Sequence, residues 1–258
     1  MALLFDAHAH FDDAKFDADR YAVLDDLFMN QQVGGILNAS ISLATCEASL
    51  SLADRYPGLY AACGIYPENV GDPKTIPSVM DRLREVLSHP KAVAVGEIGL
   101  DFHEEIVDPA VQKEWFAAQL ALSEELNLPV QVHDREAHGA CLDMIRAFPK
   151  ARGMFHSFSG SPEMAKELVS LGWYVSFSGV VTFKNAAKTP EAARIVPEDR
   201  ILIETDCPYL TPHPFRGQRN HSGYVRYTAE KIADLRGITY EAFCETTERN
   251  FKTLFGIS

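Results

Sequence analysis

The chain has 258 residues, of which 47% are hydrophobic, and this is enough to fill the core of one domain spanning residues 1–258. No apolar run approaches the roughly eighteen residues that a membrane-spanning helix needs, so we expect no membrane partner. The formal net charge of −12 excludes a general electrostatic attraction to nucleic acid, so any phosphate has to be captured locally, as bound divalent cations would do.

Short apolar runs alternate with longer amphipathic runs along the whole chain. The apolar runs predict eight strands, several of them buried on both faces. These strands are Leu3–Ala7, Gly35–Ala39, Leu59–Gly64, Ala92–Glu97, Pro129–His133, Gly153–His156, Trp173–Phe177 and Ile201–Glu204. The alternation favours an α/β fold, and we expect a (β/α)₈ TIM barrel in a single domain. A doubly wound sheet shows the same alternation, so periodicity alone leaves both architectures open.

Three helices are predicted with defined bounds. Asp108 can cap a helix over Pro109–Leu126, whose first turn accommodates the proline. A second helix opens at Ser161-Pro162 and stops before Gly172. A last helix is predicted over Tyr240–Phe255.

The cysteines and the N-terminus bear on the cellular compartment. Five cysteines lie far apart and form no C-x-x-C pair, which argues against disulfides and a thiolate zinc site. The N-terminus lacks a basic region and reaches Asp6 before any signal-like apolar stretch. We therefore expect a cytoplasmic protein.

Six residues of metal-ligand type lie at the ends of the predicted strands. They are His8, His10, Glu97, His133, His156 and Asp206. In a barrel the carboxyl ends of all strands open onto one face, so these side chains would converge there. Capping of a loop explains any one of them, but four imidazoles and two carboxylates buried together require cations to satisfy them. The pattern predicts a site for two divalent metal ions, with zinc or manganese suiting the imidazoles and magnesium also tolerated.

The chain resembles the TatD family of metal-dependent hydrolases over nearly its whole length. The resemblance rests on Phe5–His10, Gly96–Asp101, Leu128–Ala137, His156–Gly160, Glu204–Pro212, Arg216–Asn220 and Arg249–Asn250. It implies a deoxyribonuclease of the 3′–5′ exonuclease type that uses Mg, Mn or Zn on DNA or another phosphodiester. It also implies that His8, His10, Glu97 and Asp206 hold one ion, and that Glu97, His133 and His156 hold the second.

One segment departs from the family pattern. Many relatives carry His-Pro-His after the third strand, and this chain has Tyr66 and Glu68 at those histidine positions. If the family histidines contact phosphate, nuclease activity here is weaker or directed at another ester.

The proposed chemistry is attack of a metal-bound hydroxide on phosphorus, with Asp206 and Glu97 as the catalytic residues. We expect Asp206 to orient the water and receive its proton, although a role as ligand alone explains it nearly as well. Glu204, two residues before Asp206, is expected to hydrogen-bond a ligand histidine and so to orient its ring. Arg216 and Arg219 offer planar donor groups to a substrate phosphate, or else anchor their loop.

Two rival functions remain open. A metal-dependent enzyme of this kind could cleave a carboxylic ester or amide, as a D-aminoacyl-tRNA deacylase does, since the ligands do not choose between carbonyl carbon and phosphorus. A metal-binding scaffold or quality-control partner without turnover is the alternative of another class. The sequence does not identify protein partners.

Overall fold

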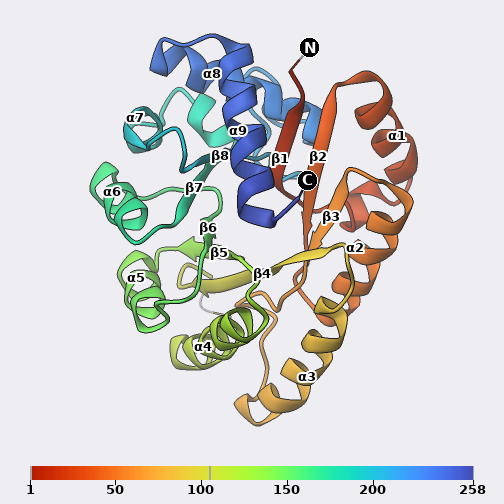
Figure 1. Cartoon of the computed structure of the whole chain (residues 1–258), viewed down its shortest axis with the longest axis vertical. Coiled ribbons are helices and arrows are strands. Elements are labelled where there is room, and N and C mark those ends of the chain that lie inside the picture. Colours follow the sequence, from red (N-terminus) through yellow and green to blue (C-terminus); the bar gives the residue numbers. More distant parts are fainter. Residues whose placement is uncertain (1, 105, 258) are drawn as a thin grey trace. The chain divides into compact units, whose positions relative to one another are not determined.

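A computed structural model describes residues 2–104 and 106–257, so Met1 and Ser258, the ends of the predicted domain, lie outside the described residues. Eight strands alternate with helices along this range (Figure 1). The chain divides into two compact units, one formed by Ala39–Phe155 and the other by Met1–Asn38 with His156–Ser258. Each unit is described by itself. That residues 1–258 make up one domain stays a prediction.

The unit Ala39–Phe155 holds four parallel strands that pair in chain order. They are β3 (Leu59–Ala62), β4 (Ala92–Asp101), β5 (Val130–Arg135) and β6 (Gly153–Phe155). Its helices are α2 (Leu43–Arg55), η2 (Pro73–Thr75), α3 (Ile76–Leu87), α4 (Pro109–Leu126) and α5 (His138–Ala147). A Cβ atom at Gly99 of β4 would lie 2.0 Å from the carbonyl oxygen of His133 on β5. Only glycine permits this approach, so Gly99 brings β4 close beside the backbone that carries His133.

The second unit contains two pairs of parallel strands, β1 (Leu4–Ala9) with β2 (Val33–Ala39) and β7 (Tyr174–Phe177) with β8 (Ile201–Ile203). Its helices are η1 (Ala14–Phe16), α1 (Arg20–Asn30), α6 (Pro162–Ser170), η3 (Gly179–Thr182), α7 (Lys188–Ile195), η4 (Ser222–Tyr224), α8 (Val225–Arg236) and α9 (Tyr240–Phe255). Ala9 forms a parallel bridge with Cys207, which brings the segment after β8 beside the carboxyl end of β1.

The apolar character of these strands accounts for their burial. Every residue of β7 and β8 is buried, as expected for strands that are covered on both faces. Helix α9 lies beside β1 in Figure 1, and the rings of Phe5 and Phe251 join them with centroids 5.1 Å apart.

The predicted helices are confirmed closely. Helices α4 and α9 have the predicted bounds, and Asp108 caps α4 by accepting a hydrogen bond from the backbone N–H of Ala110. Ser161 likewise caps α6 by accepting from Met164.

Each predicted strand differs from the observed strand at one end or both, and the ends of β1 and β4 bear most on the site. Strand β1 runs to Ala9, so His8 lies within the strand rather than after it. Strand β4 continues four residues past Glu97 to Asp101. In both places a buried polar residue continues the strand, which a search for apolar runs cannot detect.

Candidate metal centre

His8 and His10 project from the carboxyl end of β1 toward Asp206, which follows β8. The Nε2 atoms of the two histidines are 3.0 Å apart. Oδ1 of Asp206 lies 3.7 Å from Nε2 of His8 and 3.5 Å from Nε2 of His10. A hydrogen bond of 2.9 Å from the backbone N–H of Asp206 to the carbonyl of His8 fixes the two segments together.

These distances fit a single cation. Two ligand atoms that each lie about 2.1 Å from a tetrahedral ion are roughly 3.3 Å from one another. The three distances of this cluster lie on either side of that value, and all three ligand atoms lie within 4.8 Å of one another. The donor set of two imidazoles and one carboxylate is typical of zinc and manganese sites. The residues present therefore fit a divalent ion.

His156 and Glu204 extend this cluster. The ring of His156 stacks on that of His8 with centroids 4.0 Å apart and an interplanar angle of 16°. Nδ1 of His156 lies 3.3 Å from Oε1 of Glu204, which also accepts a 2.7 Å hydrogen bond from the backbone of Ser157. A carboxylate behind an imidazole fixes its tautomer and orientation. That His156 is a metal ligand stays a prediction.

The carboxyl groups of this cluster titrate differently. Burial raises the pKa of Asp206, but the hydrogen bond from His10 and the charges of His8 and His156 outweigh it and hold the pKa below its usual value. Asp206 also has a φ of 56°, a strained conformation for a residue that is not glycine. Asp6, fully buried two residues before His8, has a pKa raised by burial to about 7.

A second cluster lies within the unit Ala39–Phe155. Glu97 on β4 is 3% exposed, and its Oε1 lies 2.8 Å from Nδ1 of His133 on β5. Nε2 of the same imidazole lies 3.0 Å from Oδ2 of Asp101, at the end of β4. Burial raises the pKa of Asp101, but hydrogen bonds from His133 and His103 outweigh it and lower the pKa to about 2.

Both nitrogens of His133 thus face carboxylate oxygens, and a carboxylate can only accept hydrogen bonds. If Nε2 donates its hydrogen to Asp101, a neutral imidazole presents the lone pair of Nδ1 to Glu97. Two such acceptors at 2.8 Å require a proton or a metal ion between them. An imidazolium at His133 or a cation between Nδ1 and Glu97 would each satisfy this pair.

Sequence reasoning missed Asp101 in this cluster, and it placed Tyr66 at a family histidine position without predicting what Tyr66 contacts. The hydroxyl of Tyr66 donates to Oδ2 of Asp101 at 3.2 Å and lies 3.2 Å from Nε2 of His133. The signal for Asp101 was present, because Glu97, Gly99 and Asp101 alternate along one strand and so share a face. It was overlooked because the strand was expected to end at Glu97. Tyr66 comes from a loop, whose path has no comparable pattern.

The two arginines of the loop after β8 have different surroundings. Arg219 donates to both carboxylate oxygens of Asp19, at 2.8 and 2.6 Å, and to the carbonyl of Lys15 at 2.7 Å. Arg216 is exposed and stacks on Phe183, with its guanidinium carbon 3.8 Å from the ring centroid. The geometry favours loop anchoring for Arg219 and leaves the edge of Arg216 directed to solvent.

All five cysteines are buried and free, as expected from their spacing. Burial raises the pKa of the Cys207 thiol well above its ordinary value, which agrees with a small filler rather than a nucleophile. Among residues 2–104 and 106–257, every helix is too short or too polar to cross a lipid bilayer.

Comparisons with known proteins agree with these observations. The sequence matches the family model described as TatD related DNase over residues 5–256. It is 39% identical to the uncharacterized metal-dependent hydrolase YabD of Bacillus subtilis (strain 168), over 99% of this chain and 100% of the relative. It is 30% identical to an Escherichia fergusonii protein named 3'-5' ssDNA/RNA exonuclease TatD, over 99% of this chain and 100% of that protein. The crystal structure of YJJV, a TatD homolog from Escherichia coli K12, has a TM-score of 0.90 at 29% identity and covers 99% of this chain and 98% of that chain.

The likeness extends over the whole series of strands and helices, so the predicted (β/α)₈ barrel class is confirmed. The predicted enzyme class, a metal-dependent hydrolase, is confirmed as that of the family. The chain belongs to the TatD-related DNase family.

Proposed function

We propose that this protein is a divalent-metal-dependent deoxyribonuclease of the 3′–5′ exonuclease type. The observation that carries the proposal is the cluster of His8, His10 and Asp206, whose ligand atoms lie within 4.8 Å of one another. The named activity of the Escherichia fergusonii relative supports a nucleic acid as the substrate. Because the chain carries a net charge of −12, positive charge for a phosphate has to be supplied at the site itself.

Two places for a cation enter the proposal. His8, His10 and Asp206 would hold one ion, with His156 stacked beside them, and Glu97 with His133 would hold another. That Glu97 contributes to both ions, and that His156 is a ligand of the second, stay predictions from the resemblance. When bound, such ions lower the pKa of water and stabilise charge that develops on a phosphoryl group. Mg, Mn and Zn are all candidates.

Asp206 is the proposed proton acceptor. Because a carboxylate has two oxygens, Asp206 can face a cation with one oxygen and accept a hydrogen bond from the attacking water with the other. His8 and His10 hold their nitrogens toward the same point, and Glu204 keeps His156 from rotating. Each residue thus positions a lone pair before substrate arrives, which reduces the reorganisation required in the transition state.

The test is reconstitution of metal-stripped protein with Mg²⁺, Mn²⁺ or Zn²⁺ on single-stranded DNA labelled at one end or the other. We expect nucleotides to be released from the 3′ end with at least one metal, and none in chelator. His8→Asn should abolish release, whereas His89→Asn is the matched control because His89 pairs with Asp54 outside both clusters.

The same protein tested on an aminoacyl ester separates the rivals. Cleavage of that ester without cleavage of DNA would replace the nuclease with a carboxylic ester hydrolase. If no substrate is hydrolysed with any metal and calorimetry still shows tight metal binding, the remaining function is that of a metal-binding scaffold without turnover.

A further inference from the structure

An exposed tyrosine lies beside Asp206. Tyr209 follows it by three residues, and the backbone N–H of Tyr209 donates to the carbonyl of Asp206 at 2.9 Å. The turn fixes where the ring lies relative to the ligand carboxylate. Tyr209 is 45% exposed, although large aromatic side chains are usually well buried, so much of its ring faces solvent.

The segment after β1 holds this ring in place. The hydroxyl of Tyr209 donates to Oδ2 of Asp13 at 2.8 Å, and the ammonium of Lys15 lies 3.9 Å from the ring centroid. Partial burial of the phenol and its hydrogen bond to Asp13 raise the pKa of Tyr209 to about 12, so the hydroxyl is neutral and donates. The Lys15 ammonium therefore lies over the Tyr209 ring, and the hydrogen bond to Asp13 holds the ring in place.

Lys15 is itself positioned from the loop after β8. Arg219 donates to the carbonyl oxygen of Lys15 and stacks over Phe16, with its guanidinium carbon 4.6 Å from the ring centroid. Its paired hydrogen bonds to Asp19 hold it there. The sequence left substrate binding and loop anchoring open for Arg219, and its contacts join the loop after β8 to the backbone of Lys15.

We propose that Tyr209 and Lys15 form a subsite for one nucleotide of single-stranded nucleic acid, with the base stacked on the open part of the Tyr209 ring and the adjoining phosphate at the Lys15 ammonium. The inference rests on the proposed nuclease function. Stacking on an aromatic ring is tolerant of sequence, because every base has a π-face, and a neighbouring cation tracks the backbone. In a chain of net charge −12, a lysine held beside an exposed ring and the candidate metal ligands is a local attraction for such a strand.

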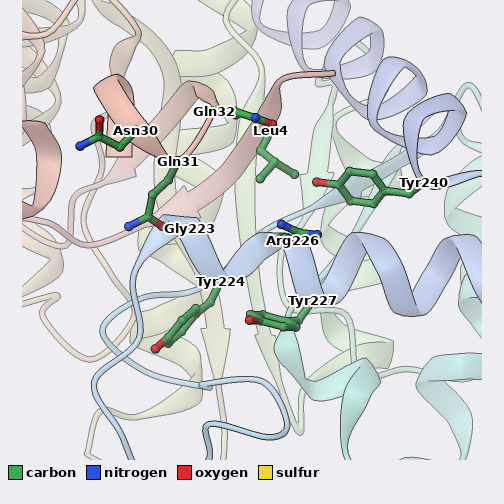
Figure 2. Close-up of a pocket in the computed structure, with 9 residues that line it drawn as sticks. All are labelled: Leu4, Asn30, Gln31, Gln32, Gly223, Tyr224, Arg226, Tyr227 and Tyr240. Carbon is green, nitrogen blue, oxygen red and sulfur yellow. The ribbon is translucent and has the colours of Figure 1, made fainter. Parts of the chain in front are cut away.

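A second tyrosine with a cation near it provides a matched control at the other end of β1. A pocket of about 280 Å³ is lined by Leu4, Arg226, Tyr240 and other residues (Figure 2). The guanidinium carbon of Arg226 lies 5.8 Å from the Tyr240 ring centroid. Leu4 begins β1 and precedes His8 by four residues, which separates the two by about 13 Å along the strand. Tyr240 therefore pairs with a cation, as Tyr209 does, but lies away from the candidate metal ligands.

The experiment measures binding of the Mn²⁺-loaded full chain to a labelled oligothymidylate of about ten nucleotides. Phosphorothioate linkages slow its hydrolysis, and the strand is checked for cleavage after each titration. Tyr209→Leu should weaken binding by about tenfold or more, because the stacked base is lost. Tyr209→Phe keeps the ring and should bind within about twofold of the parent, as should Tyr240→Leu. Lys15→Met should reduce the slope of log affinity against log salt by about one. An oligouridylate should show the same pattern, since stacking does not read the 2′-hydroxyl.

Binding of the parent protein to an oligonucleotide of abasic residues is a test that does not depend on whether a variant folds. The parent should bind the abasic strand about tenfold more weakly than oligothymidylate, and Tyr209→Leu should bind the two about equally. A parent that does not distinguish the two strands, or a folded Tyr209→Leu that retains parental affinity, would overturn the subsite while leaving the nuclease proposal intact. A parent that binds no single strand at all would overturn both.

Discussion

Two buried aspartates lie behind the two clusters and titrate in opposite directions. Asp6 precedes His8 on β1, and burial raises its pKa to about 7. Asp101 faces His133, and although burial raises its pKa, hydrogen bonds from His133 and His103 bring it to about 2. Two causes separate the two pKa values. Asp6 lies deeper and is contacted only by neutral donors, whereas Asp101 lies less deep and faces the imidazole of His133.

The two clusters also differ in which groups face their imidazole nitrogens. Around His8 and His10 two imidazole nitrogens face each other with one carboxylate nearby, so the arrangement is centred on a point shared by three ligand atoms. Around His133 each ring nitrogen already faces a carboxylate, so the arrangement is centred on one oriented imidazole. We therefore expect removal of a ligand to be costly in the first cluster and loss of orientation to be measurable in the second.

The largest expected effect is that of Asp206→Asn. The change keeps the shape but removes the charge that faces His8 and His10, and with it the proposed proton acceptor. We expect kcat/KM on single-stranded DNA to fall by about 10² to 10⁴. Asp134→Asn is the control, an aspartate on β5 that pairs with His138. A variant that retains more than half of the parental kcat/KM would remove Asp206 from the chemistry.

Asp6→Asn is expected to change how stability depends on pH. A carboxyl whose pKa is raised on folding contributes stability below its unfolded pKa, near 4, and that contribution is lost as the pH rises through about 7. Over this window the metal-free parent should lose on the order of 4 kcal/mol relative to Asp6→Asn. Urea unfolding in chelator at a series of pH values measures the difference. Parallel pH profiles for the two proteins would show that Asp6 is charged in the folded state.

Asp101→Asn tests orientation rather than ligation. The amide cannot balance the charge of an imidazolium, and it holds the Nε2 hydrogen of His133 less firmly. Losing such a carboxylate behind a ligand lowers metal affinity by about 10- to 100-fold. The sign of its pH effect is the reverse of that for Asp6, because a lowered pKa adds stability above pH 4 that is lost as the pH falls toward 2. Metal competition titrations that give parental affinity would contradict the role of Asp101.

Tyr66→Phe should have the smallest effect. It removes one hydrogen bond to Asp101 and leaves the ring, whose centroid is 4.8 Å from that of His133. A loss of about 1 kcal/mol corresponds to a few-fold weaker metal binding. The ¹⁵N shifts of His133 in the metal-free protein report the tautomer directly, and Tyr60→Phe is the matched control because its ring contacts Lys91 instead. An unchanged His133 spectrum would mean that Asp101 sets the tautomer of His133 without the hydrogen bond from Tyr66.

Much of the fold was predictable because its signals are local. Eight apolar runs located eight strands, and the caps at Asp108 and Ser161 located two helix starts to the residue. The strand ends at His8 and Glu97 were not predictable in this way, since a polar residue inside a strand resembles a loop when only neighbouring residues are compared.

The sequence by itself determined the alternation of strands and helices, the family and the residue types available to hold a metal. Only the tertiary structure decided what each polar group faces. Asp101 turns its carboxylate to His133, and Arg219, for which the sequence left two roles open, donates to Asp19 and to the backbone of Lys15. The reason is that the pattern of a strand fixes the face from which a polar side chain points, whereas the residue that it contacts comes from another part of the chain. That contacting residue sets the charge and the hydrogen bonds of the polar side chain.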